Sequence, residues 1–564
     1  MRAALVVCAL AGVVAADSKP IAGSWAGEIE IPGQKLAITI TFDGADGGLI
    51  DIPQQHATGL PLTHVAVTGT HVAFELAPVH ATFEGDLAHG AIAGTMKQGG
   101  MALPFRLAPT AAIQRVTYKV PPAPRTPLTA RVGHALLGTW SGTSGGDAQV
   151  TVRFEEHDGL VTGTVANHRL CEPPSPITGL TLTFDKLHVE NVFPDGVNTY
   201  VDGTIAGDAI SGTVFRAGVT EPFVLHRDPP APPVPWREVE VAIPSSHGTV
   251  LAGTLRLPGP GTAYPVVVTV TGSGPQDRDE CLLGIRPFRQ LAETLAKRGI
   301  ATLRYDDRGT AKSTGDFKTA TAADFADDAQ AAVAWLRAQS QTARIGILGH
   351  SEGGLIAPMV AARDPQVDFI VMWAGPGVPL DEVIMKQSHD IGLAEGTAAS
   401  AVARADRISA LTWKAFRAAK DQAAFKAALT ASLTALPPAD RAEVTDIPAF
   451  VDASLQQLWT PWFRWYNHYD PAKTLAKVTV PVLAINGGMD RQVDAKTNLA
   501  VIKRALAKNK DVTILELPGL NHIFQHTSTG AVSEYAKNPP LLDAAVLDAT
   551  ADWIALHTRV KSAP

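Results

Sequence analysis

Two patterns of hydrophobic and polar residues divide the chain. Up to about residue 227, hydrophobic and polar positions alternate, as in 36–42 (LAITITF) and 149–154 (QVTVRF). Gly, Asp or Pro interrupts the alternation every eight to twelve residues or so. A period of two is typical of half-buried strands, and turn residues at this spacing indicate many short strands. We therefore expect an all-β region of sandwich or barrel type.

This region contains an internal duplication. Residues 23–27 (GSWAG) correspond to 138–142 (GTWSG), and 92–95 (IAGT) correspond to 210–213 (ISGT). The sequence predicts β-rich repeats at 17–113 and 134–227, joined by a proline-rich linker at 114–133 and followed by a second one at 228–236. Neither copy shows paired catalytic residues. The repeats are either spacers that pack on the following domain or binding modules for a ligand or the cell envelope.

From residue 237 to 564 the pattern alternates between strand and helix. Near-continuous apolar runs predict strands buried on both faces at 264–270, 300–305, 345–348, 478–486 and 512–517. Amphipathic segments predict helices at 286–297, 322–338, 355–362 and 498–507. Alternating strands and helices favour a mostly parallel, doubly wound sheet.

Ser351 follows one of these strands directly and precedes a helix, in the run Gly346–Gly354 (GILGHSEGG). Gly349 and Gly353 leave room two residues before and two residues after it, where larger side chains would collide with neighbouring strands. The sequence therefore predicts a strained strand-to-helix turn that exposes a nucleophilic hydroxyl.

A serine hydroxyl needs a base, and that base needs a partner that fixes its tautomer. Asp490 follows the strand 478–486, and His522 follows the strand 512–517. Because the carboxyl ends of parallel strands meet at one edge of a sheet, we expect Ser351, Asp490 and His522 to form a triad. Asp494 and His526 are the alternatives, each four residues further from its strand.

An acyl transfer reaction also needs donors for the developing oxyanion. The backbone N–H of Glu352, after the nucleophile, is one expected donor. The glycine-rich segment 271–275 (TGSGP) supplies the other, from Ser273 or, as second choice, Gly274. A phosphate-binding loop is the competing interpretation, but no Gly-Lys-Ser/Thr follows the segment.

These motifs resemble those of the serine α/β-hydrolases of the bacterial EstD-like esterase type, which are related more distantly to prolyl-oligopeptidase-like and dienelactone-hydrolase-like enzymes. The resemblance spans about residues 238–560 and rests on 251–255 (LAGTL), 272–279 (GSGPQDRD), 304–309 (RYDDRG), 349–354 (GHSEGG), 461–465 (PWFRW), 486–493 (NGGMDRQV) and 521–525 (NHIFQ). It implies the α/β-hydrolase fold, with Ser351, Asp490 and His522 as the triad. Where the family usually has proline after the Gln-Val pair, this chain has Asp494.

Residues 378–459 interrupt the strands with helical, alanine-rich sequence. We expect a helical cap over the site, in which Trp413 and Phe416 belong to the cap's own core rather than to a substrate box.

Composition and charge narrow the function further. The net charge of −7 provides no basic surface for nucleic acid. Residues 1–16 have one positive charge and a short apolar run, which predicts a signal peptide, an exported protein and no integral membrane segment after its removal. Cys171 and Cys281 then remain, either as a disulfide or as two free thiols.

The sequence-based hypothesis is an exported serine hydrolase that cleaves carboxylic esters, with a small-molecule ester or acyl substrate, no organic cofactor and no metal. One alternative is a serine peptidase of the aminopeptidase or prolyl-oligopeptidase type, which would bind the substrate amine through a carboxylate such as Glu352. The other is an envelope or ligand-binding protein that uses the β-repeats. The oligomeric state stays open.

Overall fold

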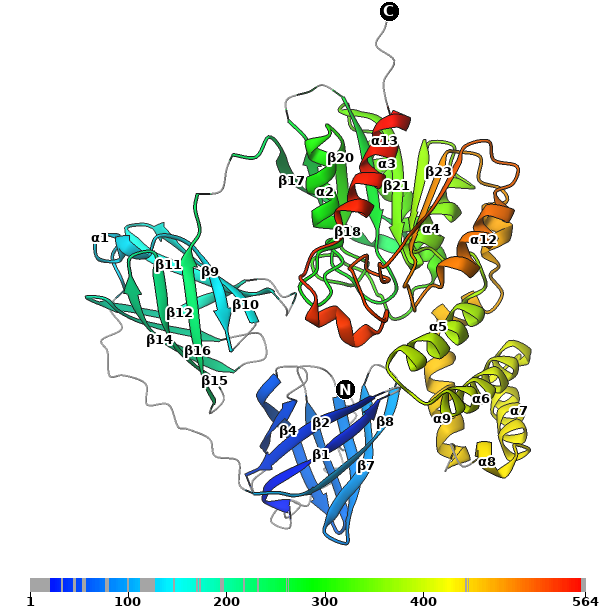
Figure 1. The fold of residues 1–564 in the computed structure, drawn as a ribbon, viewed down its shortest axis with the longest axis horizontal. Helices are drawn as coiled ribbons and strands as arrows, with labels where there is room; N and C mark the ends of the chain where they lie inside the picture. The colour runs from blue at the N-terminus through cyan, green and yellow to red at the C-terminus, as the bar shows by residue number, and fades with distance from the viewer. Residues whose placement is uncertain are drawn as a thin grey trace, which may run out of the picture. The chain divides into compact units, whose positions relative to one another are not determined.

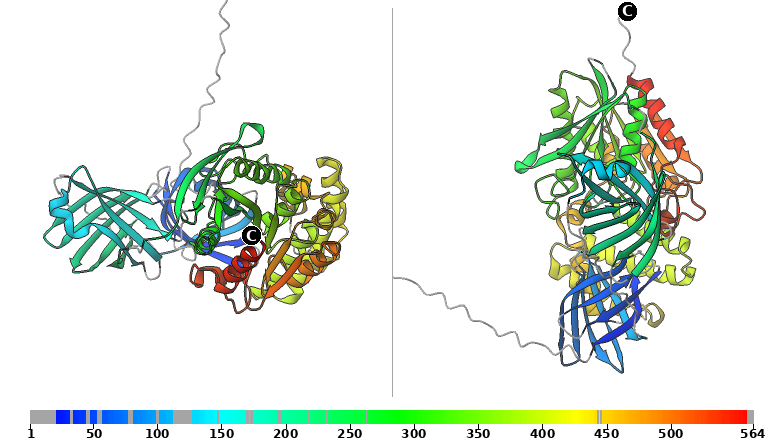
Figure 2. Two further views of the ribbon diagram at one scale, coloured as in Figure 1. Left: turned by 90° about the horizontal axis from the view of Figure 1, so that it is seen from above. Right: turned by 90° about the vertical axis from the view of Figure 1, so that its left-hand side faces the viewer.

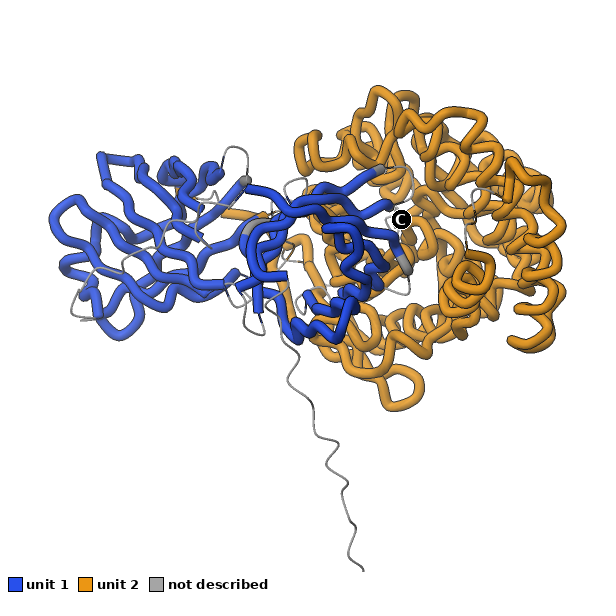
Figure 3. The backbone as a smooth tube through the Cα atoms, turned by 90° about the horizontal axis from the view of Figure 1, so that it is seen from below, with its two compact units in different colours: residues 1–167, 173–229 blue, residues 168–172, 230–564 orange. Residues whose placement is uncertain are grey.

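The computed structural model describes residues 21–558, except 32–33, 44–46, 53–56, 77–80, 99–100, 112–126, 146–147, 169–170, 172–173, 193–196, 217–218, 231–232, 260, 262, 442–443 and 445. The predicted signal peptide lies outside the described residues. The chain divides into two compact units, one of residues 1–167 and 173–229 and one of residues 168–172 and 230–564 (Figure 3). None of the helices in the described part is long and apolar enough to cross a membrane.

The first repeat forms a closed antiparallel barrel (Figure 1). Its strands are β1 (Gly23–Ile31), β2 (Gln34–Phe42), β3 (Gly48–Ile52), β4 (Ala57–Thr68), β5 (His71–Leu76), β6 (Ala81–Ala88), β7 (Ala91–Gln98) and β8 (Met101–Pro109). Alternate residues point inward, and a stack of aromatic rings that includes Phe74 and Phe83 fills the interior. The pairing of β1 with both β2 and β8 closes the barrel.

The second repeat forms another closed barrel, visible from two further directions in Figure 2. Its strands are β9 (Gly138–Ser144), β10 (Ala148–His157), β11 (Leu160–Asn167), β12 (Ser175–Thr183), β13 (Lys186–Val192), β14 (Asn198–Ala206), β15 (Ala209–Arg216) and β16 (Val219–Arg227). Leu128, beside the short helix α1 (Ala130–Gly133), already packs into its core. Of the two all-β types expected, the structure has the barrel.

The second unit contains an eight-stranded sheet in the order β17-β18-β20-β19-β21-β22-β23-β24. The strands are β17 (Arg237–Pro244), β18 (Val250–Leu257), β19 (Tyr264–Val270), β20 (Ala301–Tyr305), β21 (Thr342–His350), β22 (Phe369–Trp373), β23 (Val482–Gly487) and β24 (Val512–Leu517). All neighbours from β20 to β24 pair in parallel, whereas β17 and β18 are antiparallel. The expected α/β class is therefore confirmed for this half of the chain.

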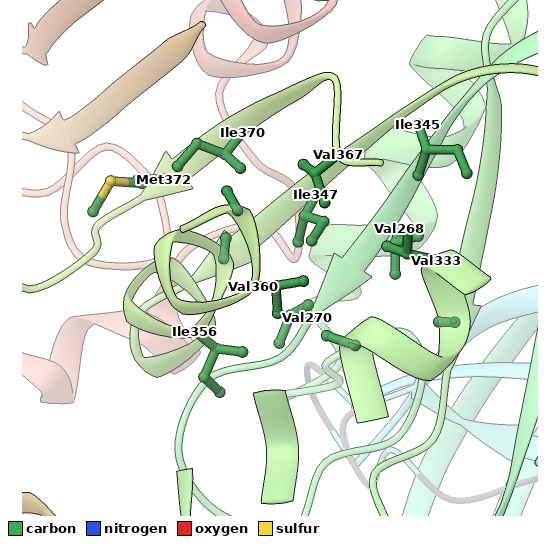
Figure 4. Close-up of a cluster of buried hydrophobic side chains, with 14 of the residues drawn as sticks. Val268, Val270, Val333, Ile345, Ile347, Ile356, Val360, Val367, Ile370 and Met372 are labelled. Atoms are coloured by element: carbon green, nitrogen blue, oxygen red, sulfur yellow. The ribbon is translucent and has the colours of Figure 1, made fainter. Parts of the chain in front are cut away.

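Helices cover both faces of this sheet. One face packs against α3 (Ala322–Arg337), α4 (Glu352–Ala361) and α12 (Ala495–Ala505), and Figure 4 shows Val268, Ile347 and Val360 in that layer. The other face packs against α2 (Pro287–Lys297) and α13 (Ala544–Thr558). Because both faces are buried, the central strands are apolar at nearly every position.

A series of helices connects β22 to β23. These are α5 (Leu380–Ala394), α6 (Ala399–Ala418), α7 (Gln422–Thr434), α8 (Pro438–Arg441), α9 (Ile447–Leu458), α10 (Pro461–Tyr466) and α11 (Pro471–Leu475). They have a hydrophobic core of their own, in which Trp413 is 7% exposed and Phe416 is 1% exposed.

A disulfide joins Cys171 to Cys281. Cys171 lies in the segment 168–172 between β11 and β12, and this segment groups with the second unit. Cys281 lies in the long connection between β19 and α2. The bond therefore closes a loop of 110 residues in sequence.

Because a covalent link over so many residues restricts the unfolded chain, replacing both cysteines should destabilise the protein. We expect Cys171→Ser/Cys281→Ser to lower the free energy of unfolding by about 2–4 kcal/mol in urea titrations under oxidising conditions. Peptide mass spectrometry without reductant should recover the two cysteines in one cross-linked species. Recovery of two free thiols from the oxidised wild type would contradict the bond.

Candidate active site

Ser351 occupies a sharp turn between β21 and α4. Its backbone has φ 53° and ψ −116°, a combination that residues other than glycine rarely adopt. A Cβ atom on Gly349 would lie 1.9 Å from the carbonyl oxygen of Gly353, and one on Gly353 would lie 2.1 Å from that of Val270. The turn therefore requires glycine at both positions, as its tight geometry predicts.

Asp490 and His522 form a buried pair. His522 Nδ1 lies 2.8 Å from Asp490 Oδ2, and both side chains are at most 6% exposed. The other carboxylate oxygen of Asp490 accepts hydrogen bonds from the backbone N–H groups of Gln492 and Val493. With Nδ1–H donated to this carboxylate, Nε2 of His522 is left as the proton acceptor.

Ser351 and His522, the predicted nucleophile and base, lie at one edge of the sheet. The turn at Ser351 follows β21, Asp490 follows β23 and His522 follows β24, and these strands run parallel within one sheet. The rings of His350 and His522 are 4.8 Å apart between centroids. Among the described contacts, Ser351 Oγ and Nε2 of His522 are not joined by a hydrogen bond, a bond that often forms only when substrate is bound.

The two alternative residues have other partners. Asp494 caps the first turn of α12 by accepting a hydrogen bond from Thr497 N–H. The side chain of His526 is 76% exposed and pairs with Asp543. The geometry therefore favours Asp490 and His522 over Asp494 and His526.

The backbone amides predicted as oxyanion donors lie after Ser351 and in the loop after β19. Glu352 begins α4, so its N–H has no partner within the helix. In the loop after β19, Gly272 N–H already donates to the side chain of Glu280, at 2.6 Å. The N–H of Ser273 has no hydrogen bond to the described residues. The N–H of Gly274, the second choice, is likewise without a hydrogen bond to the described residues, so the contacts exclude Gly272 but do not separate Ser273 from Gly274.

Asp307 holds the other side of the same loop. It accepts a hydrogen bond from the Thr271 hydroxyl at 2.7 Å and one from Gln276 N–H at 3.0 Å. Burial raises the pKa of Asp307 well above its ordinary value, although these hydrogen bonds oppose the shift. Asp307 belongs to the motif 304–309, but no role for it was predicted from the sequence.

The Glu352 side chain turns away from solvent and is 6% exposed. One carboxyl oxygen accepts hydrogen bonds from Trp462 Nε1 at 2.7 Å and from the Tyr466 hydroxyl at 2.8 Å. Burial raises the pKa of Glu352 to about 7, against the effect of the two hydrogen bonds. The residue after Ser351 is thereby connected to α10, a contact that the sequence analysis missed.

A cavity of about 560 Å³ lies between α5, α6 and the start of α12. Its lining combines apolar side chains such as Val383 and Met385 with charged ones such as Lys386 and Asp494. None of the three predicted triad residues lines it.

The mostly parallel sheet with helices on both faces and the turn at Ser351 resemble the fold of the serine α/β-hydrolases. Residues 247–523 match the model of a family described as X-Pro dipeptidyl-peptidase (S15 family). The chain is also similar to the esterase EstD of Thermotoga maritima, with 28% identity over 308 residues. That alignment covers 54% of this chain and 65% of EstD, so the chain spans less than two thirds of this relative's length. The predicted resemblance to EstD-like esterases is therefore confirmed.

The solved structures that the chain matches include two esterases. Est1E from Butyrivibrio proteoclasticus, solved with ferulic acid bound, has 17% identity and a TM-score of 0.35, and the match covers 56% of this chain and 98% of Est1E. An esterase from Pyrococcus furiosus has 16% identity and a TM-score of 0.34, over 57% of this chain and 90% of its own.

The pKa of Glu352 implies a pH-dependent stability. Between its ordinary value of 4.5 and about 7, the folded protein keeps a proton that the unfolded chain has lost, so stability falls as pH rises through this window. Glu352→Gln keeps an acceptor oxygen for Trp462 and Tyr466 but removes the titration. We expect the variant to be more stable than the wild type at pH 8, by roughly 3 kcal/mol at most, and equally stable near pH 4.5.

Chemical denaturation across pH 4.5–8.5 measures this difference. Asp327→Asn, at a surface ion pair with Arg363, is the control for general charge effects. Parallel stability curves for Glu352→Gln and the wild type would contradict the raised pKa.

Proposed function

We propose that the protein is a serine carboxylesterase. The observation that carries the proposal is the buried pair of Asp490 and His522 at the same sheet edge as Ser351, whose turn has the strained backbone of a nucleophile. The similarity to EstD supports an ester as the substrate. We propose that the substrate is a small-molecule ester.

The chemistry follows from these positions. Nε2 of His522 removes the proton of Ser351 as Oγ attacks the ester carbonyl, and Asp490 stabilises the imidazolium that forms. The N–H groups of Ser273 and Glu352 stabilise the oxyanion of the tetrahedral intermediate. Protonated His522 then donates to the leaving alcohol, which leaves an acyl group on Ser351. Water activated by His522 hydrolyses this acyl-enzyme and restores the hydroxyl.

Two further features belong to this proposal. The helices between β22 and β23 form a cap that shapes the substrate site, supported by the contacts of Trp462 and Tyr466 with Glu352. Residues 1–16 direct export, so that the enzyme acts outside the cytoplasm; their composition supports this step.

The first test is hydrolysis of p-nitrophenyl acetate, butyrate and octanoate. Ser351→Ala should lower kcat by a factor on the order of 10³ or more, because no other group replaces the nucleophile. Ser340→Ala, at an exposed position in the turn before β21, is the matched control and should hydrolyse all three esters like the wild type. Turnover by Ser351→Ala close to that of the wild type would overturn the mechanism.

A serine peptidase is the second candidate, because the matched family model is described as an X-Pro dipeptidyl-peptidase. Such an enzyme would use the same triad but would need an anionic group for the substrate amine. Glu352 suits this role poorly, because its carboxyl is buried, already accepts two hydrogen bonds and has a pKa of about 7.

A comparison of matched substrates separates the two candidates. We expect a higher kcat/KM for p-nitrophenyl butyrate than for Gly-Pro-p-nitroanilide, since the buried Glu352 offers no fixed charge for the amine. The measurement follows the absorbance of the released p-nitrophenolate and p-nitroaniline, each with its own calibration. Ser351→Ala gives the background rate in both assays. Faster cleavage of the anilide would move the assignment to a peptidase.

A further inference from the structure

A second buried pair of a histidine and a carboxylate lies behind the predicted triad. His350, the residue before the nucleophile, is 5% exposed, and its Nδ1 lies 2.9 Å from Glu280 Oε1. Its Nε2 lies 3.0 Å from the carbonyl oxygen of His522. Neither Glu280 nor His350 has a role in the mechanism proposed above.

These contacts connect the segments that carry the reaction. Glu280 Oε1 also accepts the backbone N–H of Gly272, next to the expected oxyanion donor Ser273. The sequence of contacts therefore runs from the oxyanion loop through Glu280 and His350 to the backbone of His522. His350 is also adjacent to Ser351 in the chain. The proposed nucleophile, base and oxyanion donor are therefore all connected through the side chains of Glu280 and His350.

The hydrogen bonds determine where the protons lie. A carbonyl oxygen can only accept, so Nε2 of His350 carries a hydrogen. Glu280 Oε1 faces both Gly272 N–H, at 2.6 Å, and Nδ1 of His350, at 2.9 Å, so a carboxylate at this position can accept from both. An ionised Glu280 requires a hydrogen on Nδ1 as well, which makes His350 an imidazolium. In agreement, burial opposes the charge, but the electrostatic attraction of Glu280 and its hydrogen bond outweigh it and raise the pKa of His350.

We propose that Glu280 and His350 form a buried ion pair that positions the oxyanion loop and the loop of the catalytic base relative to Ser351. This inference rests on the proposed serine esterase function. Both residues are positioning residues, because they are buried and act through the backbone groups of Gly272 and His522.

Two costs indicate that the pair is present for positioning rather than for stability. Burying two charges is expensive even when they are paired, and the second oxygen of Glu280 is buried without a hydrogen-bond partner among the described residues. Glu280 also has a left-handed backbone, with φ 54°. Both costs fall on Glu280, beside the candidate active site, where strained or incompletely bonded residues are typically kept because they hold functional groups in place.

Glu280→Gln tests the pair with little change of shape. In the wild type, Glu280 Oε1 alone contacts both Gly272 N–H and Nδ1 of His350. In the variant, the amide oxygen can accept from Gly272, but only the amide NH₂ group can donate to Nδ1 of a neutral His350, so one atom can no longer make both contacts. We expect kcat for p-nitrophenyl acetate to fall about 10- to 100-fold with KM within about twofold, because oxyanion stabilisation is lost and ground-state binding is kept. Rates are normalised to active sites titrated with a fluorophosphonate. Glu293→Gln, on the exposed side of α2, is the matched control and should keep the wild-type kcat.

A second measurement determines the protonation state of His350 in the absence of substrate. In ¹⁵N-histidine NMR of the wild type at pH 6.5, the ordinary pKa of a histidine, both ring nitrogens of His350 should be mostly protonated, with the signals assigned by their loss in His350→Asn. In Glu280→Gln, His350 should be neutral at the same pH.

Each outcome decides something. A neutral His350 in the wild type, or a folded Glu280→Gln with kcat within twofold of the wild type, overturns the inference. If Glu280→Gln does not fold, the wild-type spectrum still decides whether the ion pair exists. A wild type that hydrolyses no ester overturns the proposed function, and it leaves the protonation of His350 to the spectrum.

Discussion

The rest of the second unit depends on one steric constraint, the turn at Ser351. The chain leaves β21 and enters α4 through a positive φ, with Gly349 against the backbone of Gly353 and Gly353 against that of Val270. No side chain fits at either glycine, so β19, β21 and α4 can approach only with this sequence. This close approach also directs the first turn of α4, with its unpaired N–H groups, toward the edge of the sheet where Asp490 and His522 lie.

Buried carboxylates maintain the loop that faces this turn. Asp307 accepts hydrogen bonds from Thr271 and Gln276, at the two ends of the loop. Glu280 accepts one from Gly272, near the beginning of the loop. A glycine-rich loop loses much conformational entropy on folding. Its hydrogen bonds to buried acceptors offset part of this cost and hold the loop in one conformation. Burial is the main cause of the raised pKa of Asp307, and the nearby acids Glu352 and Glu280 raise it further.

The sequence was sufficient for features that follow from local patterns. Apolar runs and turn glycines located the strands β19, β21, β23 and β24, and the order of Ser351, Asp490 and His522 along them predicted a shared edge. The strand β22 (Phe369–Trp373) was missed, because five apolar residues after a helix lack flanking signals that distinguish them from a buried helical segment. Glu280, Asp307 and His350 were also missed, because their roles depend on contacts between loops far apart in the chain, which periodicity does not encode.

The two barrels show which part of a duplicated sequence is constrained by packing. Trp25 donates its indole N–H to the carbonyl of Ile21, and Trp140 donates to that of Leu136, so the same buried contact recurs in both copies. The turn between β4 and β5 uses Gly69 at a positive φ, whereas the corresponding turn of the second copy has Phe184, also at a positive φ and 97% exposed. A buried indole cannot be replaced without leaving a cavity and an unpaired carbonyl, but a turn position tolerates a strained residue because the hairpin around it fixes the backbone. The two copies therefore share the backbone conformation of this turn but differ in its side chain. At the buried tryptophan they share both the side chain and its hydrogen bond.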